Sequence, residues 1–141
     1  MDSEEFSRWM SQAEKTFELI DADIEYQGYS WACFKAQQAA EFAVKALLYL
    51  LGRPAFGHEI SKLIKKAGLQ VPEEVSECAV LLDRMYIPAR YPDAFSEGSP
   101  WEFFTKRDAL EAKECARKLI EWVKGLARDI EGKGGTEEEG D

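Results

Sequence analysis

Apolar side chains recur at intervals of three and four residues along most of the chain, and this spacing predicts amphipathic helices. Four segments carry the pattern, at residues 4–25, 58–67, 72–86 and 105–130. No segment alternates apolar and polar residues over the length of a strand. The pattern therefore predicts an all-α protein.

The segment from Tyr29 to Leu51 is the most apolar part of the chain. It contains six alanines and no proline or glycine, a composition that favours helix, and Gly52 and Pro54 provide a stop signal. Because apolar residues lie on nearly every side of this helix, we expect it at the centre of a helical bundle. The chain then has four long helices and one short helix.

Residues 87–104 contain three prolines and Gly98, which predict a long loop. Loops of this length are usually functional or disordered. This loop is rich in aromatic residues, so we expect it to be ordered and packed on the bundle before Thr105 caps the last helix. Residues 132–141 read GKGGTEEEGD and predict a disordered acidic tail, which leaves residues 1–131 as one helical domain.

The 141 residues carry a formal net charge of −9 at pH 7. Binding of nucleic acid through bulk charge needs clustered Lys and Arg, so this composition argues against it, although local basic patches stay open. The acidic N-terminus has no features of a signal peptide, and no apolar run reaches the length of a membrane span. We therefore expect a cytoplasmic protein without a membrane partner.

The three cysteines stand at positions 33, 78 and 115, far apart and without a C-x-x-C motif. Their odd number and wide spacing argue against a disulfide framework and against a cysteine zinc site. Each lies among apolar neighbours in a helical pattern, so we expect three buried thiols.

Gln38, Glu41 and Lys45 are spaced by three and four residues, so they share one stripe of the central helix, with Gln37 at its margin. Charged groups on a buried helix need partners. One interpretation is an ordinary ion pair between Glu41 and Lys45 within the helix. The other is a polar pocket or a self-pairing surface, and the sequence leaves both open.

A second cluster begins at Arg84 and continues through the loop residues Arg90, Tyr91 and Asp93. An arginine beside an aromatic ring can stack on it and form paired hydrogen bonds with a carboxylate or a phosphate. The alternative is a structural role, in which Arg90 anchors the loop to a helix carboxylate such as Glu41. The sequence gives no preference between these interpretations.

His58 is the only histidine, so a histidine-rich metal centre is excluded, and no metal or cofactor is expected. At a helix start, a histidine usually caps the helix or faces solvent. Arg53 precedes His58 by five positions, and such a pair can bind a phosphate and act as a general acid or base on ribose. The pattern is short and arises easily by chance.

Three motifs together resemble the HEPN domain family over residues 5–125. They are C-F-K-A-Q-Q-A-A-E at 33–41 followed by Lys45, the Gly57-His58 pair, and R-Y-P-D at 90–93. The resemblance implies an up-and-down four-helix bundle with an extra short helix, usually a homodimer. It also implies nucleotide binding and a small nucleotidyltransferase as partner in a toxin–antitoxin-like module.

One branch of that family consists of metal-independent ribonucleases with an Arg-x4–6-His motif. Here the formal match is Arg53 to His58, with Pro54 where the family commonly has a small polar residue, and Arg90 has no histidine within reach. The resemblance therefore favours a non-catalytic or weakly catalytic protein, with metal-independent RNA cleavage by Arg53 and His58 as the alternative.

The sequence thus predicts a nucleotide or RNA-phosphate site that joins the helix stripe to the loop. In this hypothesis Arg90 and Lys45 meet phosphate charge, Tyr91 stacks on a base, and Gln38 binds the base or ribose. A further alternative has no ligand, and the same residues form a dimerisation or docking face. The predicted site consists of Gln38, Glu41, Lys45, His58, Arg90, Tyr91 and Asp93.

Overall fold

The protein is a bundle of helices, as the hydrophobic pattern predicts. The computed structural model describes the backbone of residues 2–140 and the side chains of residues 2–133, and this part of the chain contains no strand. The elements are α1 (Ser3–Glu25), α2 (Tyr29–Leu50), α3 (Ile60–Lys66), α4 (Glu73–Asp83), the 3-10 helix η1 (Pro92–Ala94), α5 (Pro100–Phe103) and α6 (Lys106–Gly140).

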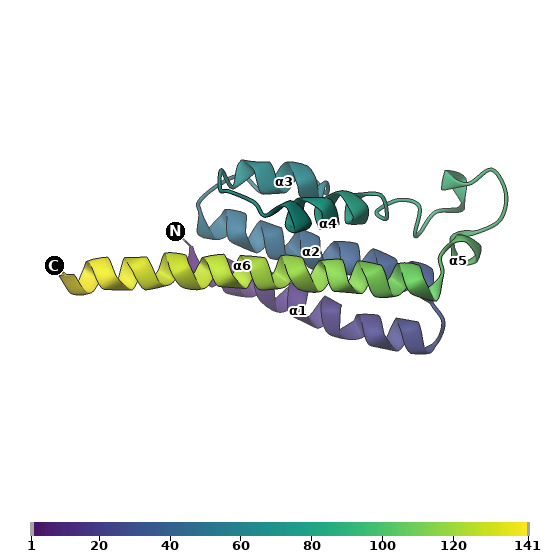
Figure 1. Ribbon diagram of the computed structural model, residues 1–141, viewed down its shortest axis with the longest axis horizontal. Coiled ribbons are helices and arrows are strands. Elements are labelled where there is room, and N and C mark those ends of the chain that lie inside the picture. The colour runs from purple at the N-terminus through teal and green to yellow at the C-terminus, as the bar shows by residue number, and fades with distance from the viewer. Residues whose placement is uncertain (1, 141) are drawn as a thin grey trace.

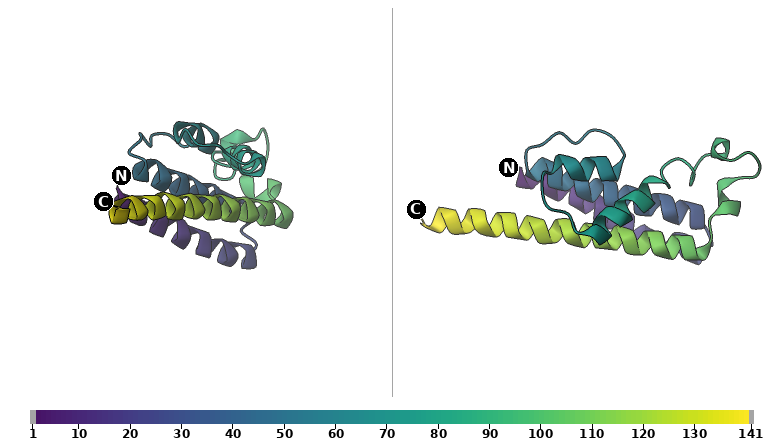
Figure 2. Two further views of the ribbon diagram at one scale, coloured as in Figure 1. Left: turned by 60° about the vertical axis from the view of Figure 1, so that its left-hand side comes forward. Right: turned by 45° about the horizontal axis from the view of Figure 1, so that its top comes forward.

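The four longest helices, α1, α2, α4 and α6, alternate in direction, and α1 begins at the same end of the bundle as α6 ends (Figure 1). α1, α2 and α6 run alongside one another, and α3 and α4 lie against α2 on the side opposite α1 (Figures 1 and 2). This is the expected up-and-down arrangement, with α3 as the extra short helix.

α2 is the central helix, and it contacts α1, α3, α4, α5 and α6. All six of its alanines are fully buried. Small side chains let the neighbouring helices approach closely, which explains why so alanine-rich a segment occupies the middle of the bundle. The same burial encloses four polar residues of α2, which are the exceptions among its otherwise apolar buried side chains: Ser30, Gln37, Glu41 and Lys45.

Side chains cap the starts of α6 and α3. Thr105 caps α6 as predicted, because its hydroxyl accepts a bond from the Asp108 amide at 3.1 Å while the Asp108 carboxylate accepts one from the Thr105 amide at 2.8 Å. The sequence placed His58 at the start of the short helix, and this was wrong by two residues. α3 begins at Ile60 because the carboxylate of Asp83, at the end of α4, accepts its first amides.

The prediction of three buried thiols was wrong for two of the cysteines. Cys78 on α4 and Cys115 on α6 form a disulfide, with their Cα atoms 5.0 Å apart. The sequence could not show which faces of these two helices meet. Cys33 is free and buried on α2, and burial, reinforced by the negative charge of Asp108, raises the pKa of its thiol from 9.0 to about 12.

The predicted long loop contains η1 and α5 and reaches beyond the end of the bundle before it returns to α6 (Figure 2). Ala89 lies in the core and Phe104 packs against it, as expected, and Pro100 is buried. Packing of the other aromatics was a wrong expectation: Trp101 is largely exposed, and Phe103 stacks on Phe95 at 4.4 Å with half of its surface open. We call residues 84–104 the arm.

The helix α6 extends to Gly140, past the first residues of α1 (Figure 1). The side chains of the predicted tail lie outside the described residues from position 134 onward, and the division into a domain at 1–131 and a tail at 132–141 stays a prediction. Among the described residues, no helix is both long enough and apolar enough to span a membrane.

Candidate functional site

A buried carboxylate organises the polar residues of α2. Glu41 is 2% exposed, and one of its oxygens lies 3.2 Å from the Lys45 ammonium. Its other oxygen accepts hydrogen bonds from the amides of Gln37 at 3.2 Å and Gln38 at 3.4 Å. The pair of Glu41 and Lys45 within the helix is therefore present, but it lies inside the protein as part of a polar cluster.

His58 completes this cluster from the segment before α3. Its Nδ1 lies 3.1 and 3.2 Å from the two Glu41 oxygens, and Gln37 donates a hydrogen bond to its backbone carbonyl at 3.2 Å. The imidazole stacks on the Tyr86 ring at 4.7 Å and 15°. Because a carboxylate accepts the proton of Nδ1, Nε2 is left as the nitrogen for a ligand. His58 keeps 55% of its side chain exposed.

Arg90 is held in a box of aromatic rings. Its guanidinium lies 4.1 Å from the ring of Phe34, 4.6 Å from that of Tyr86 and 4.9 Å from that of Tyr91, and its Nε donates to the Tyr86 carbonyl at 2.9 Å. The suggested pair of Arg90 with Glu41 was wrong, because the Glu41 carboxylate pairs with the Lys45 ammonium and contacts the His58 imidazole.

Tyr86, at the start of the arm, connects the polar cluster of Glu41 and His58 to Arg90. It stacks on His58 and is also one wall of the aromatic box around Arg90. The two sequence clusters therefore form one continuous structure, although they do not meet through the predicted contact. Tyr86 lies in the turns that follow α4, so its position depends on the end of that helix.

An open cavity of about 410 Å³ lies in front of the His58 imidazole. Arg84, at the end of α4, is exposed and takes part in no ion pair among residues 2–133. Val80 and Ile87 are half-exposed and give the cavity an apolar wall. The full lining is His58, Glu59, Val80, Asp83, Arg84, Tyr86, Ile87 and Pro88. We call this the His58 cavity.

The other predicted nucleotide-binding residues apart from Glu41 lie outside the lining of the His58 cavity. Gln38 and Lys45 belong to the cluster beneath His58. Tyr91 is half-exposed against Arg90, and Asp93 lies in η1 and is exposed. None of these four lines the His58 cavity.

Arg53 and His58 are not brought together. Arg53 donates a hydrogen bond to the carbonyl of Lys66, the last residue of α3, at 2.9 Å, whereas His58 precedes the first residue of that helix. The two side chains are therefore held at opposite ends of α3. Among the described residues, no group of three His, Cys, Asp or Glu side chains is placed to hold a metal ion.

Sequence reasoning did not assign site roles to Tyr86, Arg84 and Asp83. Tyr86 was read as part of the buried face of a helix, because it continues the spacing of Leu82 and Met85. The sequence feature that could have indicated Tyr86 and Arg84 is the high density of cationic and aromatic residues between positions 84 and 91.

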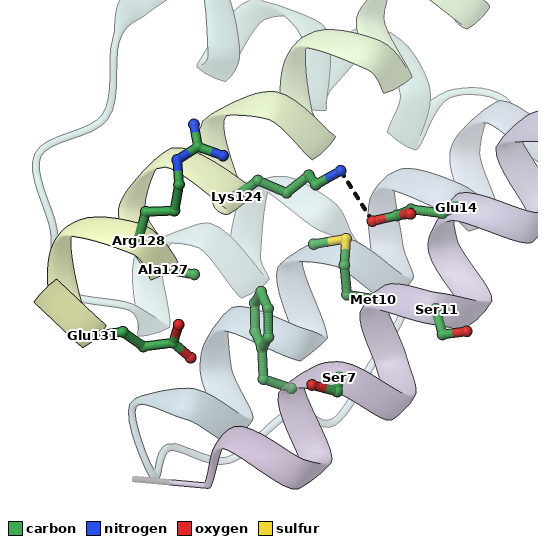
Figure 3. Close-up of a pocket in the computed structure, with 9 residues that line it drawn as sticks. Ser7, Met10, Ser11, Glu14, Lys124, Ala127, Arg128 and Glu131 are labelled. Carbon is green, nitrogen blue, oxygen red and sulfur yellow. Dashed lines mark ion pairs between the residues drawn. The ribbon is translucent and has the colours of Figure 1, made fainter.

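A second cavity, of about 340 Å³, lies between α1 and the end of α6 (Figure 3). Its walls include Phe6, Met10 and Arg128, and an ion pair of Glu14 with Lys124 at 3.1 Å crosses it. None of the predicted site residues lines it. We call this the α1–α6 cavity.

Comparison with known proteins gives a consistent family signal. The family model described as the HEPN domain matches residues 6–126. A relative from Methanocaldococcus jannaschii named "Putative toxin MJ1304" is 26% identical over 132 residues, which cover 86% of this chain and 87% of that protein.

Solved structures show the same fold. TT1696 from Thermus thermophilus superposes with a TM-score of 0.82 at 38% identity, over 85% of this chain and 96% of that one. ST0689, an archaeal HEPN homologue, gives 0.76 at 40% identity over 89% and 98%. An HEPN domain protein from Thermotoga maritima gives 0.69 at 31% identity over 85% and 97%.

Proposed function

The chain belongs to the HEPN domain family, and we propose that it binds a nucleotide or an RNA phosphate in the His58 cavity. The observation that carries the proposal is the arrangement of His58. A buried carboxylate orients this imidazole, an aromatic ring supports it, and an arginine without an ion-pair partner among the described residues lies in the same cavity.

The phosphate would meet Arg84 and Nε2 of His58. Arginine presents a planar fork of donors that fits phosphate oxygens, and an imidazole held by a carboxylate is a directed hydrogen-bond donor when it is protonated. Arg84 makes no ion pair among the described residues, so a phosphate would not have to displace a carboxylate from it.

The base or ribose would lie against the apolar wall of Val80 and Ile87. These side chains are about half-exposed and border the same cavity. A nucleotide combines a flat, largely apolar base with an anionic phosphate. Contact of the base with an apolar wall does not select one base over another.

The predicted residues take supporting positions in this proposal. Lys45 neutralises Glu41 beneath His58, Gln38 helps to fix Glu41, and Arg90 anchors the arm that carries Tyr86. Tyr91 and Asp93 lie farther along the arm, where they would meet a longer RNA and not a mononucleotide.

We also propose that the protein works with a partner in a toxin–antitoxin-like pair. The toxin-named relative supports a toxin-like role, and the exposed Trp101 and Phe103 of the arm offer a surface for a homodimer or a nucleotidyltransferase. The experiment for this part is co-purification from the native host, where recovery of no nucleotidyltransferase would contradict it.

Calorimetric titration of ATP, GTP and a short RNA into the full chain tests the ligand. A charge-assisted bond from Arg84 to phosphate is worth about 1.5–3 kcal/mol, so Arg84→Ala should weaken binding about tenfold or more. Arg128→Ala is the matched control, because Arg128 also lines a cavity and forms no ion pair among residues 2–133. Equal, unsaturable heats from all three proteins would contradict the proposal.

RNA cleavage without a metal is the second candidate function, and the contact of Glu41 with His58 favours it. An imidazole oriented by a carboxylate can take the 2′-hydroxyl proton of a ribose. The 2′-oxygen then attacks the adjacent phosphorus, the bond from phosphorus to the 5′-oxygen breaks, and the 5′-oxygen leaves as a hydroxyl after it takes up a proton, so a 2′,3′-cyclic phosphate remains. Incubation of RNA with EDTA and wild type, His58→Ala or Arg53→Ala tests it. Cleavage that survives His58→Ala would exclude His58 as the catalyst.

A further inference from the structure

Asp83, the last residue of α4, holds the beginning of α3. One of its carboxylate oxygens accepts the Ile60 amide at 2.6 Å, and the other accepts the Ser61 amide at 3.2 Å and the Ser61 hydroxyl at 2.5 Å. These three bonds cross between two helices that lie more than twenty positions apart in the sequence.

α3 has no comparable cap of its own. It comprises seven residues, and Glu59, which stands at its N-cap position, makes no side-chain cap bond. A helix this short is not stable by itself, and its first amides need an acceptor. The carboxylate of Asp83 supplies that acceptor and places a negative charge at the positive end of the helix.

α4 is a firm support for this cap. Val75, Cys78, Ala79 and Leu82 are buried on its inner face, and the disulfide to Cys115 ties it to α6. The short helix α3, whose Ile60, Leu63 and Ile64 are buried, is therefore also tied to α4 at its first turn by the Asp83 side chain.

The bonds of Asp83 lie two residues from His58. The contacts of His58 with Glu41, Gln37 and Tyr86 all require that the segment before Ile60 runs past the middle of α2. We propose that Asp83 is a positioning residue of the His58 cavity: it fixes the first turn of α3 and thereby keeps the His58 imidazole between Glu41 and Tyr86. For its effect on ligand affinity, the inference rests on the proposed function.

Without the cap, His58 would spend part of its time away from Glu41 and Tyr86. The measured dissociation constant rises in inverse proportion to the fraction of molecules that hold the competent arrangement. Loss of a cap of this kind should lower the ratio of competent to displaced molecules about fivefold, so affinity should fall by at most about fivefold.

The first experiment reads the position of His58 without any ligand. His58 is the only histidine, so its ring protons give one resolved pair of NMR signals. Stacking on Tyr86 at 4.7 Å shifts these signals upfield through the ring current. In Asp83→Ala the shift should shrink toward that of a free histidine, and the amides of Ile60 and Ser61 should exchange faster with solvent.

Two variants separate positioning from charge and from stability. Asp83→Asn keeps one of the two accepting oxygens and replaces the other with an NH2 group that cannot accept, so its ring-current shift and its affinity for ATP should lie between those of wild type and Asp83→Ala. Asp108→Ala removes a comparable cap at the start of α6, outside the lining of the His58 cavity, and should leave the His58 signals unchanged.

The outcomes distinguish this inference from the proposed function. An unchanged ring-current shift in Asp83→Ala would overturn the positioning role, whether or not wild type binds ATP. If both Asp83→Ala and Asp83→Asn bind ATP more tightly than wild type, Asp83 acts as a repelling charge in the cavity, and the positioning role is again overturned. Absence of ATP binding by wild type would contradict only the proposed function.

Discussion

Two ion pairs in this protein have the same chemistry and opposite surroundings. Glu41 and Lys45 lie 3.2 Å apart with side chains 2% and 10% exposed. Glu14 and Lys124, across the α1–α6 cavity, lie 3.1 Å apart with side chains 45% and 42% exposed (Figure 3). The distances are nearly equal, and the difference is burial.

Burial changes what the carboxylate can do. Glu14 is open to water, so its ion pair with Lys124 contributes little to stability and does not fix the orientation of another group. Glu41 cannot be hydrated, so each of its oxygens is held by protein groups, and this fixes the direction of the His58 imidazole. The buried carboxylate of Glu41 thus fixes the orientation of the His58 imidazole, which remains accessible to solvent.

Removal of the two glutamates should give the largest contrast. Glu41→Ala leaves the Lys45 ammonium buried without a counter-charge and should lower the free energy of unfolding by about 3–5 kcal/mol. Glu14→Ala should cost about 0–1 kcal/mol, because its pair is open to solvent. Urea unfolding of both variants measures this, and equal losses would contradict the contrast.

Reduction of the disulfide tests the link that ties α4 to α6. Cys78 and Cys115 are 37 positions apart, and a cross-link that closes a loop of this size stabilises by about 3–4 kcal/mol in the chain-entropy model. Dithiothreitol reduces the bond to two thiols and is itself oxidised to a cyclic disulfide. Urea unfolding of wild type with and without dithiothreitol should show this loss of stability. The double variant Cys78→Ser/Cys115→Ser has no disulfide, so its stability should be the same with and without dithiothreitol.

The contrast also marks what the sequence could and could not predict. The helices followed from spacing, and the central position of α2 followed from its six alanines, because helix propensity and burial are local properties. The polar stripe around Glu41 followed from the same spacing. Its interior position followed from the apolar neighbours on every side of α2.

The partners of these groups did not follow, because they come from other elements. Glu41 meets His58 from the segment before α3, whose first turn is capped by Asp83 of α4, and Cys78 meets Cys115 where α4 lies on α6. The stacking of Tyr86 on His58 depends on the turns after α4. Such contacts depend on the packing of whole helices, which the spacing within one helix does not determine.

The buried thiol of Cys33 gives a smaller effect, which appears at high pH. Its pKa is raised from 9.0 to about 12, so above pH 9 the unfolded chain loses a proton that the folded chain keeps. The stabilisation is complete below pH 9 and is lost as the pH rises, by on the order of 1 kcal/mol between pH 9 and pH 10.

Thermal unfolding of wild type and Cys33→Ala between pH 8 and pH 10 measures this contribution. The variant should lose stability less steeply than wild type, and its lower starting stability does not affect the slope. Parallel slopes would show that the Cys33 thiol does not contribute.

The most direct test of the central claim follows the single histidine while ATP is added to the full chain. We expect the ring signals of His58 to shift along a saturable curve, with the same dissociation constant as calorimetry gives, and Arg84→Ala to move that curve to higher ATP concentration. Saturable binding of ATP with stationary His58 signals would place the ligand elsewhere and contradict the assignment of the His58 cavity.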